Sequence, residues 1–403
     1  MDFERTLSPV IRKISRGFPV LLLTGMRQTG KTYLLKRIME PGRKYVTLDS
    51  PDDRELAKTH PDLFLQRYTP PVIIDEVQYA PELFTHIKIY SDTNGKNGLF
   101  WLTGSQKFVL MKGIQESLAG RIAVLDLLGL SYNEMSLKPQ SRPFLPSMNT
   151  AKYETRAIRL LDLYKIIWNG SFPRLFVNRG KNREVFFRSY LQTYVERDVK
   201  DYQGITDTIK FHKFIRACAV RTGNLLNYTD MARDADIDVR TAKSWLAALE
   251  RSGLVRLLYP YYANITKRLL KTPKLYFMDT GLCAFLGGFD TPASLEAGNL
   301  NGAILETWAF AEIIRSYWHN GSDPSVYFYR DADQREIDFV IEQNMTLYPI
   351  EVKKTSAPSP DHAKNFGLLS KLNKPVGTGA VLCLRPSPLP LNEKAVALPV
   401  WGI

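Results

Sequence analysis

The chain has 403 residues, which is more than one hydrophobic core usually serves, so we expect two to four domains. A hydrophobic content of 44% with 24% charged residues is ordinary for a globular protein. The net charge of +13 is not ordinary, and it favours a polyanionic partner. Nucleic acid comes first and a membrane surface second, with an effect on solubility alone as the alternative.

The cysteine, histidine and apolar patterns exclude several other classes. The three cysteines lie far apart and the five histidines do not cluster, so neither a zinc site nor a disulfide framework is expected. No apolar run approaches the ~20 residues of a membrane span, and the first residues lack a signal-peptide pattern. We therefore expect a cytoplasmic protein with no membrane partner.

The stretch 21–32 predicts a buried strand, a glycine-bounded loop and the start of a helix. Its loop fits the phosphate-binding pattern GxxxxGK[ST] without departure. Gly25 and Gly30 allow the backbone angles that turn successive N–H groups toward phosphate oxygens. We expect Lys31 to hold the β- and γ-phosphates of ATP and Thr32 to bind Mg²⁺. The predicted nucleotide-binding residues are Gly25, Met26, Arg27, Gln28, Thr29, Gly30, Lys31, Thr32 and Tyr33.

A second apolar strand, 72–74, ends in two acids, as a Walker B strand does. We expect Asp75 to bind Mg²⁺ through water and Glu76 to polarise the water that attacks the γ-phosphate. Further strands are predicted over 44–49, 99–105 and 122–127. Helices are predicted within 1–20, before a turn at 17–19, and over 52–68. This alternation indicates parallel βαβ units with the phosphates at the carboxyl ends of the strands.

Two polar residues of this domain are candidates for sensing or assisting hydrolysis. Ser105, or alternatively Gln106, follows a strand where the γ-phosphate is expected, although small polar residues also end strands for local reasons. Arg121 closes the predicted helix 116–121 and could reach the nucleotide of a neighbouring subunit, which implies a homo-oligomer. A helix C-terminus also attracts cations without any function.

Several segments together resemble the prokaryotic AAA-type ATPase family with a nuclease-like C-terminal domain. They are the phosphate-binding loop, Ile74-Asp75-Glu76-Val77-Gln78, Leu102-Thr103-Gly104-Ser105 and Leu118-Ala119-Gly120-Arg121. Later segments are similar in the same order: Gly170-Ser171-Phe172-Pro173, Tyr194-Val195-Glu196-Arg197-Asp198, Asp279-Thr280-Gly281-Leu282 and Ile350-Glu351-Val352-Lys353. The resemblance covers nearly the whole chain and implies an ATPase.

The middle of the chain has the outline of a winged helix. After a proline-rich boundary at 138–150 and a helical region, segment 224–278 predicts two short helices and two strands. DNA binding would place the second helix in the major groove and the basic strand connection on the backbone. A lid or a protein contact is the alternative. The predicted nucleic-acid contacts are Arg240, Lys243, Ser244, Lys267, Arg268 and Lys271.

The last part predicts a helix over 302–318 and strands over 326–330, 336–341, 347–353, 379–384 and 396–400. Asp338 and Glu351 are expected near each other, with Lys353 on the same face as Glu351. This matches the D…ExK arrangement of metal-dependent nucleases and resembles the restriction-endonuclease-like fold. Asp338, Glu351 and Glu306 would hold Mg²⁺, and Lys353 would position or deprotonate water. Whether such a domain cleaves DNA stays open.

These interpretations predict an α/β protein with four segments. An AAA-type P-loop ATPase domain occupies 1–137, a linker and helical region 138–223, a winged helix 224–290 and a restriction-endonuclease-like domain 291–403. We expect an ATPase that couples turnover of ATP and Mg²⁺ to the binding, remodelling or processing of DNA. Two alternatives stay open: a nucleotide-gated switch or scaffold that binds a protein, and an ATP-regulated, Mg²⁺-dependent DNA nuclease.

Overall fold

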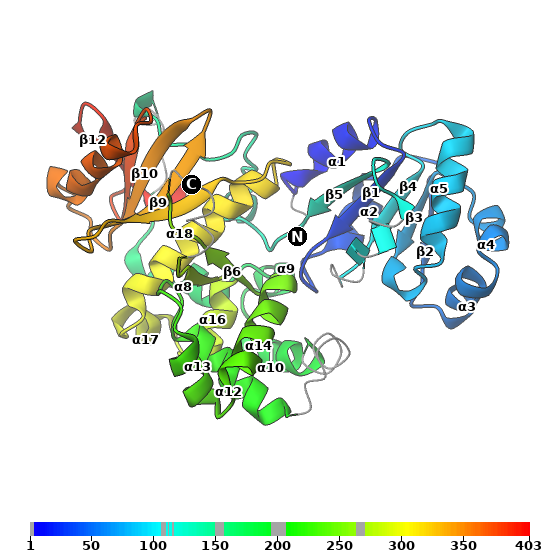
Figure 1. Ribbon diagram of the computed structural model, residues 1–403, viewed down its shortest axis with the longest axis horizontal. Coiled ribbons are helices and arrows are strands. Elements are labelled where there is room, and N and C mark those ends of the chain that lie inside the picture. Colours follow the sequence, from blue (N-terminus) through cyan, green and yellow to red (C-terminus); the bar gives the residue numbers. More distant parts are fainter. Residues whose placement is uncertain are drawn as a thin grey trace.

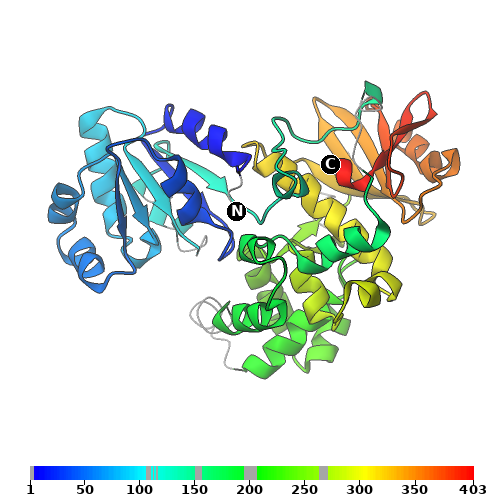
Figure 2. The same cartoon turned by 180° about the vertical axis from the view of Figure 1, so that it is seen from behind.

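The computed structural model describes residues 4–105, 110–111, 113–114, 117–149, 157–194, 207–262 and 271–403. They form two lobes, which Figures 1 and 2 show from opposite sides. The first lobe holds the elements from α1 to β5, and the second holds those that follow. Within the described ranges, no helix is long and apolar enough to span a membrane.

The first lobe is built on a five-stranded sheet whose strands are all parallel. The spatial order is β2-β3-β4-β1-β5. Parallel strands place their carboxyl ends at one edge, and the predicted nucleotide-binding segments follow strands at that edge. The strands are β1 (Val20–Thr24), β2 (Lys44–Thr47), β3 (Val72–Asp75), β4 (Phe100–Thr103) and β5 (Ile122–Asp126).

Separate hydrophobic cores cover the two faces of this sheet. Successive residues of a strand point to opposite faces, so Leu21 and Leu22 of β1 enter different cores. Leu21 packs with residues of α1 (Leu7–Ser15) and α2 (Lys31–Ile38). Leu22 packs with residues of α5 (Leu83–Asn94).

The predicted helix over 52–68 is wrong in one respect, because it is two helices, α3 (Pro51–Thr59) and α4 (Pro61–Arg67). Pro61 cannot continue a helix.

Helices make up most of the second lobe up to residue 300. A short helix α7 (Tyr132–Met135) lies in the chain that leaves the first lobe. Within 224–278 the structure has the two predicted helices, followed by an antiparallel strand pair, β6 (Val255–Leu258) and β7 (Lys274–Phe277). The helices are α8 (Leu160–Asn169), α9 (Pro173–Val177), α10 (Arg183–Tyr194), α12 (Thr208–Ala219), α13 (Tyr228–Ala235), α14 (Val239–Arg251), α16 (Thr280–Leu286) and α17 (Pro292–Ala297).

The C-terminal part packs helix α18 (Asn301–Trp318) against a six-stranded mixed sheet. Its order is β12-β13-β11-β10-β9-β8. The predicted strands over 336–341 and 347–353 pair as a hairpin, with Asn344 and Met345 at positive φ in its tight turn. The strands are β8 (Val326–Arg330), β9 (Glu336–Gln343), β10 (Thr346–Val352), β11 (Gly379–Cys383), β12 (Leu389–Asn392) and β13 (Ala395–Pro399).

One hydrophobic cluster continues from the helices of the second lobe into this sheet. Leu163 of α8, Phe214 of α12, Tyr276 of β7, Phe310 of α18 and Phe339 of β9 all belong to it. Tyr276 and Phe310 stack with ring centroids 4.3 Å apart. The helical part and one face of the C-terminal sheet therefore share a core, while a second cluster, which includes Val340 and Phe366, packs separately within the C-terminal part.

Candidate nucleotide site

The loop after β1 is held tightly between strand and helix. Gly25 has φ +136°, and a Cβ atom there would overlap the carbonyl oxygen of Leu127. Gly30 has φ +91° at the start of α2, a conformation that favours glycine. The side chain of Thr29 closes the loop internally by donating to the Met26 carbonyl (2.9 Å). These local contacts and glycine conformations thus determine the backbone conformation of the loop, whose N–H groups are predicted to face phosphate.

Replacing Gly25 with Ala is expected to destabilise the first lobe by about 3 kcal/mol or more, because the new methyl group meets backbone and the φ value is strained. Gly42→Ala is the matched control, since Gly42 also has positive φ but has no atom within 4 Å of its added Cβ. Its expected cost is only about 1 kcal/mol. Urea unfolding of both variants measures the difference, and equal losses would contradict the steric account.

Lys31 and Thr32, the first residues of α2, both hydrogen-bond across the loop region. The Lys31 ammonium donates to the carbonyls of Gly25 (3.0 Å) and Met26 (2.9 Å). The Thr32 hydroxyl donates to both carboxylate oxygens of Asp75 (2.9 and 3.0 Å). Asp75, at the end of β3, is 5% exposed. The structure therefore brings the loop and the Walker B strand together as predicted.

Two further hydroxyls surround the Asp75 carboxylate. Tyr45 donates to it from β2 (3.0 Å), and Thr103 donates from the end of β4. Burial, followed by the charge of Asp75, raises the pKa of Tyr45, so the phenol keeps its proton. Thr32, Tyr45 and Thr103 thus approach Asp75 as neutral hydroxyls. Thr32 and Asp75 form an oxygen-donor set of the kind that Mg²⁺ prefers, so they fit this ion.

Glu76 directly follows β3 in a left-handed conformation, with φ +56°. A non-glycine residue pays strain for such a φ, and strained residues cluster at functional sites. The Glu76 carboxylate accepts a hydrogen bond from the buried Gln78 amide, while its backbone N–H donates to Thr103 (3.3 Å). Ser105 lies beyond β4, and its hydroxyl oxygen is buried and has no hydrogen-bond partner among the residues that the structure describes. Gln106 lies outside the described residues.

Arg121 lies at the opposite end of the sheet from its own loop. It precedes β5, whose register with β1 pairs Val20 with Ile122. The phosphate-binding loop begins at the other end of β1. The length of the strand, at a rise of ~3.3 Å per residue, separates Arg121 from the loop by roughly 15 Å. The guanidinium forms an exposed ion pair with Asp92 of α5, at 3.0 Å for one of its contacts. Arg121 therefore does not contact the phosphate-binding loop of its own subunit.

The second lobe approaches the phosphate-binding loop near Gly30 and near Met26. A Cβ atom on Gly30 would lie 4.0 Å from Cγ of Pro173, the first residue of α9. A Cβ atom on Gly253, which follows α14, would lie 3.3 Å from Cγ of Met26. Met26 also belongs to the large hydrophobic cluster of the second lobe. The loop thus lies at the junction between the lobes.

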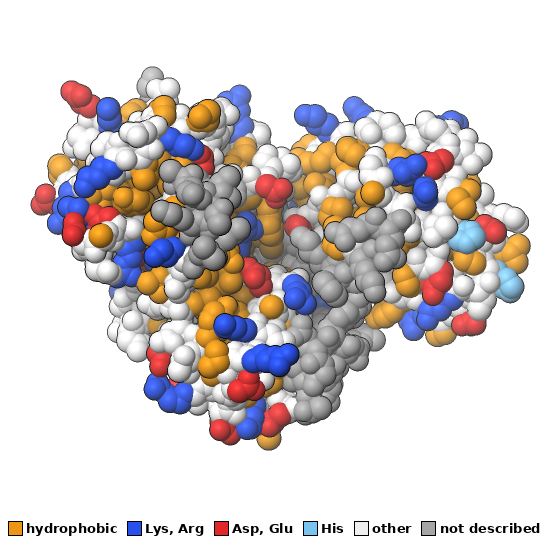
Figure 3. Space-filling view, in the orientation of Figure 1, with side chains coloured by type: hydrophobic (Ala, Val, Ile, Leu, Met, Phe, Trp, Pro, Cys, Tyr) orange, Lys and Arg blue, Asp and Glu red, His pale blue; other side chains and the backbone are white. Residues whose placement is uncertain are grey.

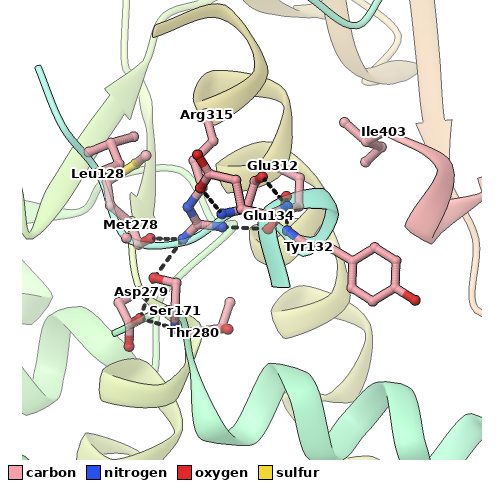
Figure 4. A network of polar contacts seen from close by, with 12 residues as sticks. Leu128, Tyr132, Glu134, Ser171, Met278, Asp279, Thr280, Glu312, Arg315 and Ile403 are labelled. Atoms are coloured by element: carbon pink, nitrogen blue, oxygen red, sulfur yellow. Dashed lines mark hydrogen bonds and ion pairs between the residues drawn. The ribbon is translucent and has the colours of Figure 1, made fainter. Parts of the chain in front are cut away.

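A buried polar network lies within the second lobe (Figure 4). Arg315 of α18 is 1% exposed and ion-pairs with Glu312 (2.6 Å). Its other terminal nitrogen donates to the Ser171 hydroxyl (3.0 Å) and the Met278 carbonyl (2.6 Å). Asp279 accepts hydrogen bonds from the Ser171 N–H (2.6 Å) and hydroxyl (2.7 Å). The segments 170–173 and 279–282, noted for their resemblance, therefore meet here.

The carboxylates predicted for the C-terminal site also lie near one another. The β9–β10 register brings Glu351 opposite Asp338, and Lys353 ion-pairs with Glu351 (2.6 Å). Lys353 lies 3.9 Å from Asp338. Burial, followed by the charge of Asp338, raises the pKa of Glu306 and of Glu351. The helix and both strands thus contribute to one charged cluster.

This cluster does not fit a metal ion as its side chains lie. Glu306 accepts hydrogen bonds from Lys274 (3.2 Å) and Tyr276, and Asp338 accepts one from the Val352 N–H (2.8 Å). Among the described residues, no group of three or more His, Cys, Asp and Glu side chains could hold a metal ion.

Three of the predicted nucleic-acid contacts belong to α14, and the other three belong to the connection between β6 and β7. Arg240, Lys243 and Ser244 are exposed on α14, and the Lys243 ammonium lies 5.5 Å from the centre of the Tyr228 ring. Lys271 is exposed, whereas Lys267 and Arg268 lie outside the described residues. On the face shown in Figure 3, Lys and Arg side chains are interspersed with Asp and Glu.

Sequence reasoning missed three polar residues around the loop. Gln78 holds the Glu76 carboxylate, and Arg5 donates to the carbonyl of Thr29 (3.0 Å). Glu134 accepts from Arg5 Nε (3.1 Å). A local signal did exist for Glu134, because Ser131-Tyr132-Asn133-Glu134 fits the capping-box pattern that opens α7. No local pattern could pair it with Arg5, 129 residues away.

The parallel sheet, the loop and the two acids at the end of β3 are the features of an AAA-type P-loop domain. Residues 17–136 match the family model described as an AAA domain, which confirms the N-terminal part of the sequence prediction. Residues 160–293 and 301–403 match two models described as domains of unknown function, DUF8612 and DUF4143. These two matches do not test the winged-helix or nuclease-like predictions.

Two curated relatives span most of the chain. An uncharacterized protein of Mycobacterium tuberculosis is 27% identical over 398 residues, which cover 98% of this chain and 83% of the relative. An uncharacterized protein of Methanocaldococcus jannaschii is 25% identical over 341 residues, which cover 80% and 72%.

Two solved structures show weak likeness. The Holliday junction branch migration motor RuvB of Thermotoga maritima aligns with a TM-score of 0.31 at 13% identity, covering 63% of this chain and 89% of RuvB. A signal transduction ATPase with a tetratricopeptide repeat sensor from Pyrococcus horikoshii aligns with a TM-score of 0.25 at 12% identity, covering 80% and 48%. Likenesses of this size say nothing about function.

Proposed function

We propose that the protein binds and hydrolyses ATP at residues 25–33. The hydrogen-bonded contact between Thr32 and Asp75 carries the proposal, because it joins the two motifs that such a site needs. Lys31 neutralises phosphate charge, and Glu76 orients and polarises the attacking water. When Mg²⁺ is bound, Thr32 and Asp75 would hold it, and its charge would neutralise part of the phosphate charge. Nucleotide binding by calorimetry in the presence of Mg²⁺ is the direct test, and a lack of binding would overturn the proposal.

We further propose that Arg121 acts on the nucleotide of a neighbouring subunit in a homo-oligomer. Its position away from its own loop supports action between subunits, although its ion pair with Asp92 must then open. Arg121→Ala and Lys31→Ala are each expected to lack ATPase activity. A mixture of the two is expected to regain part of it, because some junctions then combine an intact arginine with an intact loop. A mixture as inactive as its components would contradict action between subunits.

We propose duplex or branched DNA as the partner of the second lobe, with segment 224–278 acting as a winged helix. The exposed cations of α14 and the net charge of +13 support this proposal. We expect the double variant Arg240→Ala/Lys243→Ala to bind DNA about ten-fold more weakly at 100 mM salt, with a shallower salt dependence. Lys58→Ala/Lys96→Ala, which removes two exposed cations of the first lobe, is the control. Fluorescence anisotropy measures both.

The alternative is a nucleotide-gated switch whose winged helix binds a protein. In that case DNA affinity is weak, depends little on the α14 cations and is the same in the two double variants. The nuclease alternative stays a prediction of the sequence, since the carboxylate cluster does not fit a metal ion in the observed arrangement.

A further inference from the structure

We infer that Arg5 is a positioning residue for the phosphate-binding loop, and that Glu134 holds Arg5 in place. The inference rests on the proposed function, because the loop is taken to bind ATP. Arg5 precedes α1 and is 4% exposed. Its side chain reaches the loop from outside, so it lies among the supports of the site and makes no contact with a substrate.

The Arg5 guanidinium ties the loop to the chain that leaves the sheet. One terminal nitrogen donates to the Thr29 carbonyl (3.0 Å), and the other donates to the Leu128 carbonyl (2.7 Å). The carbonyl and N–H groups of a trans peptide point in opposite directions. Holding the Thr29 carbonyl therefore aims the Gly30 N–H away from Arg5. We assign that N–H to the phosphate-facing side of the loop.

Glu134 fixes the orientation of the guanidinium. One carboxylate oxygen accepts from Arg5 Nε (3.1 Å) and from the Thr6 N–H (2.8 Å), and the other accepts from the Ser131 N–H (3.0 Å). Glu134 is fully buried. Burial alone would raise its pKa, but Arg5 and these backbone donors hold the pKa below its ordinary value. Glu134 therefore stays ionised, and its carboxylate holds the Arg5 guanidinium in one orientation.

The support continues into the second lobe. His319, after α18, lies 3.5 Å from Glu134, and burial lowers the pKa of His319 to about 4, so the imidazole is neutral at pH 7. The Tyr132 N–H of α7 donates to Glu312 of α18 (2.9 Å), next to Arg315 in Figure 4. The loop, α7 and α18 are thus joined through hydrogen-bonded side chains.

A second buried arginine, Arg43, serves as a control that distinguishes a purely structural role of Arg5 from a role in positioning the loop. Arg43 is also buried, at 5% exposed, and donates to the Gly98 carbonyl (2.7 Å) and to Glu40. Its guanidinium lies 4.0 Å from the centre of the Trp101 ring, and Gly98 precedes β4 at the sheet edge opposite the loop. Lysine at either position keeps the charge and loses the planar fork.

The experiment compares Mg²⁺·ATP binding by calorimetry, ATPase kinetics and thermal unfolding in full-length wild type, Arg5→Lys and Arg43→Lys. We expect both variants to lose comparable thermal stability. Only Arg5→Lys should weaken ATP binding, by about ten-fold or more in Kd, which equals about 1.4 kcal/mol. KM should rise with Kd while kcat falls less, because the chemical groups Lys31 and Glu76 remain.

Equal ATP affinity in Arg5→Lys and Arg43→Lys would overturn the inference. If Arg5→Lys does not fold, Glu134→Gln enters the same measurements, because it keeps the size of the side chain and removes the charge that orients Arg5. Unchanged ATP affinity in that variant would also overturn it. A wild type that does not bind ATP would instead overturn the proposed function, so the two failures are distinguishable.

Discussion

Lys31→Ala is expected to lower ATP turnover by at least ~100-fold, the cost of removing one preorganised charge from a transition state with developing charge. The Lys31 ammonium already lies within the loop, bonded to its first two carbonyls, so few rearrangements separate it from bound phosphate. Steady-state phosphate release by the purified protein measures the effect. Thermal unfolding should show that the variant still folds.

The matched control is Lys58→Ala, which removes an exposed lysine from α3 in the same lobe. Its turnover should stay within about two-fold of wild type, because surface substitutions of this kind usually change little. If Lys31→Ala turned over ATP as fast as the control, residues 25–33 would not be the site of hydrolysis.

Glu76→Gln is expected to separate binding from hydrolysis. Removing a general base typically costs 10²- to 10⁴-fold in rate, whereas the amide keeps the size of the side chain near Gln78. Turnover should therefore fall by about 100-fold or more while Mg²⁺·ATP binding stays within about three-fold of wild type. Calorimetry and phosphate release on one preparation measure both quantities.

Glu82→Gln serves as the control for Glu76→Gln, since Glu82 is an exposed acid at the start of α5. It should change neither binding nor turnover. An ATP affinity that falls in parallel with the rate in Glu76→Gln would argue against a role limited to the attacking water. Glu76 would then support the loop or the ion.

The nucleotide site was predictable because its parts are local in sequence. The glycines of the loop, Lys31 and Thr32 lie within eight residues, and Asp75 ends an apolar strand that its composition already indicates. The parallel alternation of strand and helix then brings the two pieces to one edge of the sheet. Helix caps were equally local, as Asp238 at the start of α14 illustrates.

What the sequence did not indicate depends on distant pairing or on weak patterns. The ion pair between Arg5 and Glu134 joins residues 129 apart, and no periodicity relates them. Strand β12 contains Pro390, which weakens a strand pattern, and it lies at the sheet edge. The 3₁₀ segment η4 (Pro360–Leu372) was also missed, because its hydrogen-bond spacing does not follow the 3.6-residue period.

The core that α18 shares with the helical region bears on how the second lobe can be dissected. A fragment cut at 290/291 would strip α18 of its neighbours on α8 and β7 and leave Phe310 without the stacked ring of Tyr276. Newly bared aromatic surface of this kind promotes aggregation. Inactivity of such a truncated piece would reflect its collapse, and the roles of its carboxylates are better read from point variants of the intact polypeptide.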